Sequence, residues 1–539
     1  MVWKYLALRI AAGLDFSLLN LAIFLVAFFS GISTQWLAFA EENNSHQTNG
    51  EIPFLYSSPF AFRNETPSPA PNVSYGTPHN RPHARTHHVA VPAARGQITD
   101  RHGNALAINS AVIYPVFDSY SRVDHPGSRW MNQDHSEMLS WMIEELDYLS
   151  EFQAESRESL IRIWLQDYRD FEKDHPYLPY FFSLPFNQEQ IEILQQKQAI
   201  IPRGFRSIPS YFRLYPSGHA FSHVLGYVDR IRANSAHRKK GMIQLFPRYT
   251  GKSFGLDSFF ENHLRGTDGS WWRFFNNAKV KLRDEIKKAP QTNHHVVSTL
   301  DKELQEAIHS KFIQKNIDGA VYVRELCTGE VWALVSTPSY NANSFRFKKE
   351  PSVYNRLHQD PRNPLHNKVF TAYSYPHSLK SFDSIIKSNS ESYFKKIPTE
   401  IYGLGSGKSI GREKLKLTLI HLAHASINPH LNLPRPTIAK QIVDAQSNRL
   451  IDHFPRTFSD CANTTQWHND SLIKTSSLSQ SPKKLSEWTF QRSQPESHFG
   501  QFLIEKTELV FHVSFRVDDT ERFSDAFEIL EEELEKMLR

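Results

Sequence analysis

Hydrophobic and polar positions divide the chain into three stretches of different character. Residues 16–40, FSLLNLAIFLVAFFSGISTQWLAFA, contain no charged side chain. An uncharged run of this length can cross a bilayer as a helix. Residues 41–88 lack a periodic apolar pattern and are rich in Asn, Ser, Pro and His, which predicts a flexible tether. Beyond them, alternating and helical periodicities predict ordered structure.

The first ordered block has a mixed pattern of strands and helices. Alternation in HHVAVPAARGQITDRHGNALA, from residue 87, predicts short strands, and the RHGN sequence at 101–104 predicts a turn. Helical spacing of apolar residues predicts helices over residues 134–172 and 186–198. Short strands are expected around residues 207–230. This block is therefore expected to be an α+β domain.

The second ordered block begins near residue 294 and predicts an α/β domain. A strand leads to Asp301 at a helix start, and the helix has an apolar face of Leu304, Ile308 and Phe312. Residues 318–340 predict a hairpin that turns at Thr328 and Gly329. The chain ends with an alternating strand and an amphipathic helix. The apolar stripe of that last helix consists of Phe523, Phe527, Leu530 and Leu534.

Composition excludes some classes of function. A chain of 539 residues predicts two or three domains. The net charge is only +5, and no basic tract points to nucleic acid. The 26 histidines show no metal-binding spacing, so neither a metal nor another cofactor is expected. The two cysteines, Cys327 and Cys461, form no CxxC motif. An oxidising compartment would allow them to form one disulfide.

The charges around the uncharged run predict its orientation. Lys4 and Arg9 precede it and Glu41 follows it, which predicts cytoplasmic residues 1–15 and an exported body. The ending Ala38-Phe39-Ala40 also fits a signal-peptidase site. Because the run is longer than a usual signal sequence, we favour a retained transmembrane anchor; cleavage stays open.

Three segments of the first block carry a family resemblance when taken in order. They are residues 95–107 (RGQITDRHGNALA), 213–228 (RLYPSGHAFSHVLGYV) and 251–269 (GKSFGLDSFFENHLRGTDG). With the hairpin and the single N-terminal run, they resemble the class B penicillin-binding proteins of the elongation type, the penicillin-binding protein 2 group. The resemblance implies a pedestal (dimerisation) domain at 89–293. It also implies a shortened transpeptidase-like domain of the β-lactamase-like α/β fold at 294–539.

The family catalyses acyl transfer through three motifs: Ser-x-x-Lys, Ser-x-Asn and Lys-Thr-Gly. In the first motif, the lysine one helical turn from the serine takes its proton. Residues 371–380, TAYSYPHSLK, keep Lys380 but place His377 at the nucleophile position. The neighbouring Ser378 would face away from Lys380 on a helix, so it can serve only if this segment is not helical.

The other two motifs also depart from the family pattern. Ser388 keeps the first position of the second motif, but Ser390 replaces its amide. The short interval between Lys380 and Ser388 leaves no room for the helices that the family places there. In LIKTSSLSQ, residues 472–480, Lys474 and Thr475 match the third motif on a predicted edge strand. Ser476 replaces its glycine, and Ser477 supplies the hydroxyl for substrate.

Three hypotheses follow from the resemblance. In the first, the chain is a catalytically inactive homologue of the bacterial inner membrane with a periplasmic body. It would act in peptidoglycan synthesis and cell shape as a scaffold or regulator of an elongation glycosyltransferase, beside cell-shape scaffold proteins. In the second, it is a divergent D,D-transpeptidase that uses Ser378 and binds peptidoglycan stem peptides and β-lactams. In the third, it is a drifting paralogue without a role.

Overall fold

The structure is a computed structural model, and every residue it describes belongs to one unit, Ser58–Arg539. The described residues are 85–118, 171, 177–181, 205–231, 241–251, 254–277, 281–345, 351–370, 373–374, 416–417, 419, 423, 434, 436–454, 484–491, 496–506 and 509–538.

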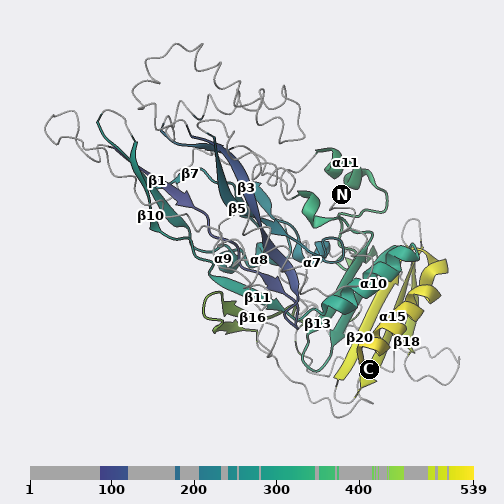
Figure 1. Cartoon of the computed structure of the whole chain (residues 1–539). Coiled ribbons are helices and arrows are strands. Elements are labelled where there is room, and N and C mark those ends of the chain that lie inside the picture. The colour runs from purple at the N-terminus through teal and green to yellow at the C-terminus, as the bar shows by residue number, and fades with distance from the viewer. Residues whose placement is uncertain are drawn as a thin grey trace, which may run out of the picture. The chain divides into compact units, whose positions relative to one another are not determined.

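The first described strand, β1, belongs to a sheet of four described strands in the order β10-β9-β1-β7 (Figure 1). The strands are β1 (Arg85–Val91), β7 (Ile243–Gln244), β9 (Gly269–Phe275) and β10 (Lys281–Lys288). β1 begins at Arg85 and pairs along its whole length with β9. β1 therefore includes residues 85–88, which the sequence predicted to be the end of the tether.

A second sheet crosses the predicted domain boundary. Its order is β17-β16-β11-β2-β3-β4, and β5 also pairs with β3. The bounds are β2 (Ile98–Thr99), β3 (Ala105–Phe117), β4 (Tyr180–Phe181), β5 (Phe205–Leu214), β11 (His294–Ser298), β16 (Ala439–Asp444) and β17 (Leu450–His453). β11, from the predicted transpeptidase-like domain, pairs in parallel with β2 of the pedestal. The two predicted domains thus share one sheet.

The region around residues 207–230 differs from its prediction of short strands. β5 is one ten-residue strand, antiparallel to β3. The shorter elements that follow are α7 (Ser222–Leu225), β6 (Asp229–Ile231), β8 (Arg248–Thr250), α8 (Leu256–Phe259) and α9 (Glu261–Leu264). β5 is long because β3 offers a continuous partner over residues 108–117, and local sequence pattern does not report such a partner.

The third sheet has the order β13-β12-β20-β19-β18. Its strands are β12 (Gly319–Glu325), β13 (Val331–Thr337), β18 (Lys484–Gln491), β19 (Glu496–Lys506) and β20 (Leu509–Val517). Helices α10 (Lys302–Gln314) and α15 (Phe523–Leu538) pack side by side on one face (Figure 1). The predicted hairpin, terminal strand and terminal helix are confirmed.

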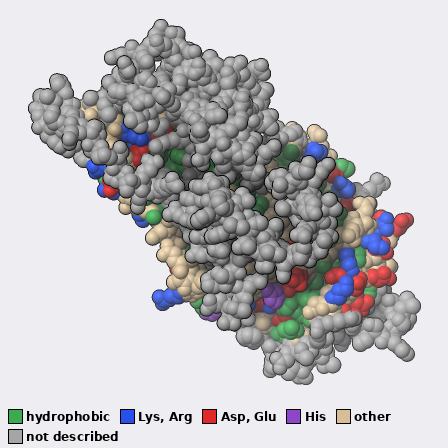
Figure 2. Space-filling model, in the orientation of Figure 1, with side chains coloured by type: hydrophobic (Ala, Val, Ile, Leu, Met, Phe, Trp, Pro, Cys, Tyr) green, Lys and Arg blue, Asp and Glu red, His purple; other side chains and the backbone are tan. Residues whose placement is uncertain are grey.

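The N-terminus of α10 follows from its sequence. The Asp301 carboxylate accepts a hydrogen bond from the backbone N–H of Leu304 at 2.9 Å, which satisfies one of the free donors at the helix start. Leu304, Ile308 and Phe312 are buried against the sheet, as predicted. The outer faces of α10 and α15 carry charges of both signs (Figure 2), and Lys311 pairs there with Glu532 at 2.6 Å.

Two large hydrophobic clusters lie among the described residues, beside a small one around Tyr211 and Tyr249. One lies between α10, α15 and the third sheet. The other joins Leu106 and Phe221 of the pedestal to Tyr322 and Leu334 of the hairpin. The core, like the second sheet, therefore continues across the predicted boundary at residues 293 and 294.

Several smaller elements and predictions complete the description. The remaining elements are η3 (Ala342–Phe345), α11 (Pro351–Gln359), β14 (Tyr373–Ser374), β15 (Lys416–Leu417) and η5 (Thr520–Arg522). Among the described residues no helix is both long and apolar enough to cross a membrane. The predicted anchor at 16–40 and the helix at 186–198 lie outside the described residues, as does the helix at 134–172 apart from Phe171.

Candidate functional site

The residues predicted for acyl transfer lie outside the part of the chain that the structure describes. They are His377, Ser378, Lys380, Ser388, Ser390, Lys474, Thr475, Ser476 and Ser477. Their proposed roles stay predictions. The described edge strand of the third sheet, β18, begins at Lys484, beyond the segment 472–480 that was predicted to form an edge strand.

The described chain before the first motif is held by a buried lysine. Lys368 Nζ donates to Asp518 Oδ2 at 2.6 Å, and its backbone N–H donates to Ser336 Oγ at 3.0 Å. Burial lowers the pKa of Lys368, and the Asp518 charge partly offsets this effect. Arg516 also pairs with Asp518. Lys368 thus fixes the chain twelve positions before Lys380, where β13 and β20 end.

Sequence reasoning did not identify Lys368. The available signal was a lysine within the run NKVF at residues 367–370, where a charge interrupts apolar positions. A buried lysine requires a partner, but nothing in the sequence pattern points to Asp518, which lies 150 residues further along the chain.

The most complete polar constellation in the described chain joins the three pedestal segments. Asp257, from the third segment, accepts hydrogen bonds from Arg213 Nε at 3.0 Å and Arg213 Nη2 at 2.9 Å. Arg95, from the first segment, donates to the same carboxylate at 3.2 Å. Tyr215 Oη, from the second segment, donates to it at 2.9 Å. We call Arg95, Arg213, Tyr215 and Asp257 the signature network.

Burial sets the electrostatics of this network. The side chains of Arg95, Arg213 and Asp257 are at most 1% exposed. Burial alone would raise the pKa of Asp257, but the charges of Arg213 and Arg95 outweigh it and lower the pKa. Glu261 pairs with Arg95 at 2.8 Å, so two carboxylates balance two guanidinium groups. Removing one of its charged members would leave an uncompensated buried charge, at a cost of about 3–5 kcal/mol.

Gly96 is required where the network meets the shared sheet. Its carbonyl accepts from Arg213 Nη1 at 2.6 Å, and its N–H donates to the Leu264 carbonyl at 2.7 Å. A Cβ added at this glycine would lie 1.7 Å from the carbonyl oxygen of His294. The glycine in the first segment therefore permits β11 to approach the pedestal backbone.

The end of the first segment contacts the transpeptidase-like region directly. The Arg101 guanidinium lies 3.4 Å from the ring centroid of Trp332 and pairs with Glu330 at 3.0 Å. The Asp100 carboxylate accepts from the N–H of Lys302, at the start of α10, at 3.3 Å. One short segment therefore holds both the pedestal interior and the hairpin.

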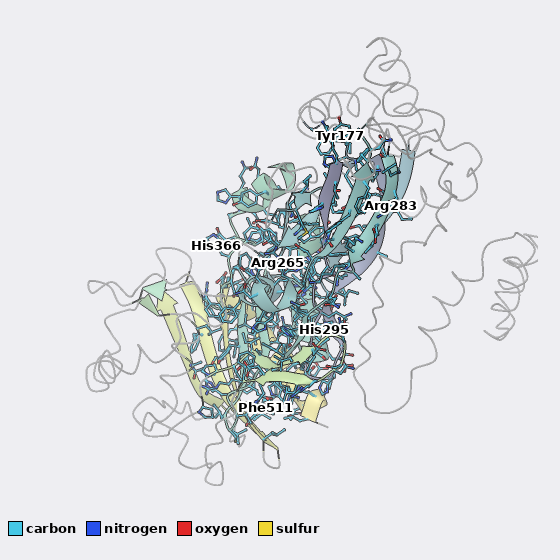
Figure 3. The ribbon with its side chains drawn as sticks, turned by 90° about the vertical axis from the view of Figure 1, so that its left-hand side faces the viewer. Tyr177, Arg265, Arg283, His295, His366 and Phe511 are labelled. Atoms are coloured by element: carbon cyan, nitrogen blue, oxygen red, sulfur yellow. The ribbon has the colours of Figure 1, made fainter. Side chains whose placement is uncertain are left out.

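His295 lies at the seam between the two regions (Figure 3). Its Nδ1 accepts from the Gln97 N–H at 2.8 Å. Burial, with a smaller contribution from the Arg213 charge, lowers its pKa to about 4, so the imidazole is neutral at pH 7. Figure 3 also shows Phe511 on the third sheet and Tyr177 at the far end of the pedestal strands.

The contribution of these described residues is to hold parts of the chain in position. No three His, Cys, Asp or Glu side chains within the described ranges gather as metal ligands would. The signature network presents no exposed nucleophile, because all four of its side chains are buried. It holds the pedestal backbone and, through the Gly96 carbonyl, the start of the shared sheet in one arrangement.

Comparisons with known proteins agree with this architecture. A family model described as the penicillin-binding protein dimerisation domain matches residues 90–298. Peptidoglycan D,D-transpeptidase MrdA of Escherichia coli (strain K12) is 28% identical over 294 residues, which cover 53% of this chain and 42% of that protein. Penicillin-binding protein 3 of Bacillus subtilis (strain 168) is 25% identical over 298 residues, covering 55% of this chain and 40% of that protein. The chain thus spans about two fifths of the length of these curated relatives.

Solved structures are also similar to this chain in fold. Penicillin-binding protein 2 of Helicobacter pylori, in a complex with MreC, matches with a TM-score of 0.51 and 16% identity. The match covers 80% of this chain and 95% of that chain. At this identity the likeness shows the fold alone. The mixed α/β architecture and the dimerisation domain expected from the sequence are confirmed.

Proposed function

Because the chain belongs with the class B penicillin-binding proteins that resemble penicillin-binding protein 2, we propose that it acts in peptidoglycan synthesis and cell-shape maintenance without catalysing transpeptidation. The observation that carries this proposal is the departure of all three acyl-transfer motifs at a decisive position. His377 replaces the nucleophile, Ser390 the amide and Ser476 the glycine. A serine–lysine acyl transfer needs each of these groups within hydrogen-bond distance of the reacting atoms.

The role we assign is that of a scaffold or regulator. The complete signature network supports it, since the pedestal keeps the residues that define its interior. The Helicobacter pylori relative is seen in a complex with MreC. We infer that this chain likewise binds a cell-shape scaffold protein and a membrane glycosyltransferase. Its body would be periplasmic and its inner-membrane anchor would be residues 16–40.

A second candidate function rests on a specific feature of the sequence. Ser378 lies beside the expected nucleophile position, and Ser384 lies three residues before Lys387, which reproduces the Ser-x-x-Lys spacing. The second candidate is therefore a D,D-transpeptidase with a shifted nucleophile. Both serines lie outside the described residues.

Penicillin acylation distinguishes the two candidates. The full-length chain in detergent is incubated with a fluorescent penicillin, and the intact mass is measured with the E. coli MrdA relative as the positive control. We expect no adduct on this chain. An adduct that is lost in Ser378→Ala or Ser384→Ala would establish the enzyme and overturn the non-catalytic proposal.

Partner binding is tested separately. The tagged chain is isolated from native membranes, and co-purifying cell-shape proteins are identified by mass spectrometry against a tagged control of the same membrane topology. We expect an MreC-like protein or an elongation glycosyltransferase to be enriched. If neither is enriched above the control after cross-linking, the scaffold role is refuted.

A further inference from the structure

The pedestal meets the transpeptidase-like region along β11, and both histidines of this strand lie at the seam. β11 pairs in parallel with β2, with Val296 opposite Ile98. Its first two residues are His294 and His295. Because successive side chains of a strand point to opposite faces, the two rings reach the pedestal from opposite faces of the shared sheet. Both rings are therefore placed where a change in their charge acts on this contact.

His295 holds the first pedestal segment through a nitrogen that acid can protonate. Its Nδ1 accepts from the Gln97 N–H at 2.8 Å, and the Val296 N–H donates to the Gln97 carbonyl at 2.9 Å. The neutral imidazole therefore carries its proton on Nε2. A second proton would have to bind at Nδ1, where it would face the Gln97 N–H. Two donors would then oppose each other, so a charged His295 cannot keep this hydrogen bond.

His294 faces a pedestal histidine from α9. The Nδ1 atoms of His294 and His263 lie 3.4 Å apart, whereas their ring centroids lie 5.4 Å apart. The Nδ1 edges of the two rings therefore face each other. While at least one ring is neutral, the N–H of one can point to the lone pair of the other. When both rings are charged, two N–H donors and two positive charges meet at this distance.

We propose that the seam is an acid-sensitive contact, in which protonation of His294, His295 and His263 separates β11 from the pedestal while the third sheet keeps its fold. Val296 and Ile98, on the paired strands, belong to the hydrophobic cluster that crosses the predicted boundary, and such a separation would loosen that cluster. The cluster between α10, α15 and the third sheet is built from other elements. The proposal concerns a contact between two regions, so it does not depend on the proposed function.

The charged and titratable groups around the two β11 rings do not favour a second proton. The groups that face His295 are Arg213, His294 and Asp444. The groups that face His294 are His263 and Asp444. The Asp444 carboxylate supplies the negative charge among these described groups, but it already accepts hydrogen bonds from two backbone N–H groups of its own turn. Burial, more than any of these charges, lowers the pKa of His295 to about 4 and also lowers the pKa of His294.

The direction of the pH dependence follows from these lowered pKa values. A histidine released from the seam titrates near about 6.5, above its pKa in the closed seam. The opened seam therefore binds more protons, and the closed seam is fully favoured only above about pH 6.5. As the pH falls towards the folded pKa of His295, about 4, each such histidine raises the equilibrium constant for opening by up to about tenfold per pH unit.

Hydrogen exchange in the full-length chain, purified in detergent, tests the proposal. Exchange is measured at roughly pH 7.5 and 5 and corrected for the intrinsic rate at each pH, which gives an opening constant for each peptide. For peptides from β2 and β11, we expect this constant to rise by about tenfold or more at the lower pH. At that pH, peptides from β12 and β20 should stay at least about tenfold more protected. No rise at the seam, or equal opening constants at the seam and in the third sheet, would overturn the proposal.

Histidine variants test which groups carry the effect. His295→Asn places Oδ1 at the position of Nδ1, where it accepts from the Gln97 N–H at every pH. Combined with His263→Asn, which removes one of the two facing imidazoles, it should abolish most of the rise in the opening constant of the seam. His453→Gln is the control, since His453 is exposed on β17 of the same sheet, and it should keep the full rise.

The single variant His263→Asn separates titration from a defect in folding, because His263 is only half-buried. It should be as protected as the wild type at the higher pH and should reduce the rise at the seam by about threefold or more. If it leaves the rise unchanged, or if the double variant opens at the lower pH as readily as the wild type, these histidines do not control the seam.

Discussion

The signature network and the acyl-transfer motifs are both made of three segments far apart in the chain, but they differ in what they retain. In the pedestal, the third segment supplies the Asp257 carboxylate. Arg95 of the first segment and Arg213 and Tyr215 of the second all donate hydrogen bonds to it. Each predicted acyl-transfer motif departs from the family pattern at one position in the sequence. The described pedestal segments thus form a complete set of contacts, whereas the predicted acyl-transfer motifs differ from the pattern they resemble.

The physical reason lies in what each residue contributes to folding. A charged member of the signature network cannot change alone without a cost, because the groups left behind would be uncompensated buried charges. A catalytic serine or glycine in an open cleft contributes little to stability, and its replacement often leaves the fold intact. Within one chain, the fold can therefore be kept while catalytic residues are replaced.

The largest effect is expected at Gly96. Gly96→Ala places a Cβ 1.7 Å from the His294 carbonyl oxygen, so β11 must move away from the pedestal. We expect the free energy of unfolding to fall by more than about 4 kcal/mol, measured by urea denaturation. Gly241→Ala is the control, because its φ is +78° but no atom lies within 4 Å of the added Cβ; it should cost about 1 kcal/mol. Equal losses in the two variants would contradict the close approach.

The next effect concerns the network itself. Asp257→Asn keeps the shape of the side chain but removes the charge between Arg95 and Arg213, and we expect a loss of about 3–5 kcal/mol in the free energy of unfolding. Glu285→Gln, which removes an exposed partner of Lys287, should leave stability unchanged. If Asp257→Asn is as stable as the wild type, the network does not hold the pedestal together.

A smaller, pH-dependent effect is expected in the third sheet. Burial, with a smaller contribution from the Arg324 charge, lowers the pKa of His512 to about 3, whereas an unfolded histidine titrates near about 6.5. The unfolded chain therefore binds one more proton over this interval. The contribution of neutral His512 is complete above about pH 6.5 and is lost as the pH falls towards the folded pKa, by up to about 1.4 kcal/mol per pH unit.

His512→Gln tests this linkage. The free energy of unfolding is measured from roughly pH 4.5 to 7.5, a range that covers the unfolded pKa and part of the fall towards the folded pKa. It should depend less steeply on pH in the variant. His295→Gln should act in the same direction at the seam, since burial also lowers the pKa of His295, to about 4. Parallel curves for wild type and His512→Gln would show that His512 is not a neutral buried group.

The smallest effect is expected in the acyl-transfer motif. His377→Ser restores a serine three residues before Lys380, yet we expect no penicillin adduct by intact mass. Ser390 and Ser476 would still replace the other two decisive residues, and acyl transfer requires all of these groups in place. An adduct on the new serine, absent from a His377→Ala control, would show that only one substitution separates this chain from its catalytic relatives.

Local patterns predicted local structure well. Asp301 begins α10, the hairpin turns at Thr328 and Gly329, and the final helix buries Phe523, Leu530 and Leu534. Each of these features depends on residues a few positions apart, which is the range that periodicity and capping report.

Contacts between distant segments were not predictable in the same way. The pedestal segments were recognised, but the convergence of Arg95 and Arg213 on Asp257 was not, and Lys368 was missed. The pairing of β11 with β2 was also absent from a prediction that placed a domain boundary before residue 294. Such contacts depend on which surfaces meet after folding. The pattern of apolar and polar residues within one segment does not identify the segment with which it will pair.

The strand β11 has a further consequence for how this gene can be shortened. A protein that ends at residue 293 would lack β11 and leave the β2 edge without its neighbour. It would also open the cluster that Leu106 and Phe221 share with Tyr322 and Leu334. A nonsense mutation there would therefore cost the pedestal its own fold. The region after residue 293 is therefore needed for the pedestal to fold, independently of any reaction it catalyses.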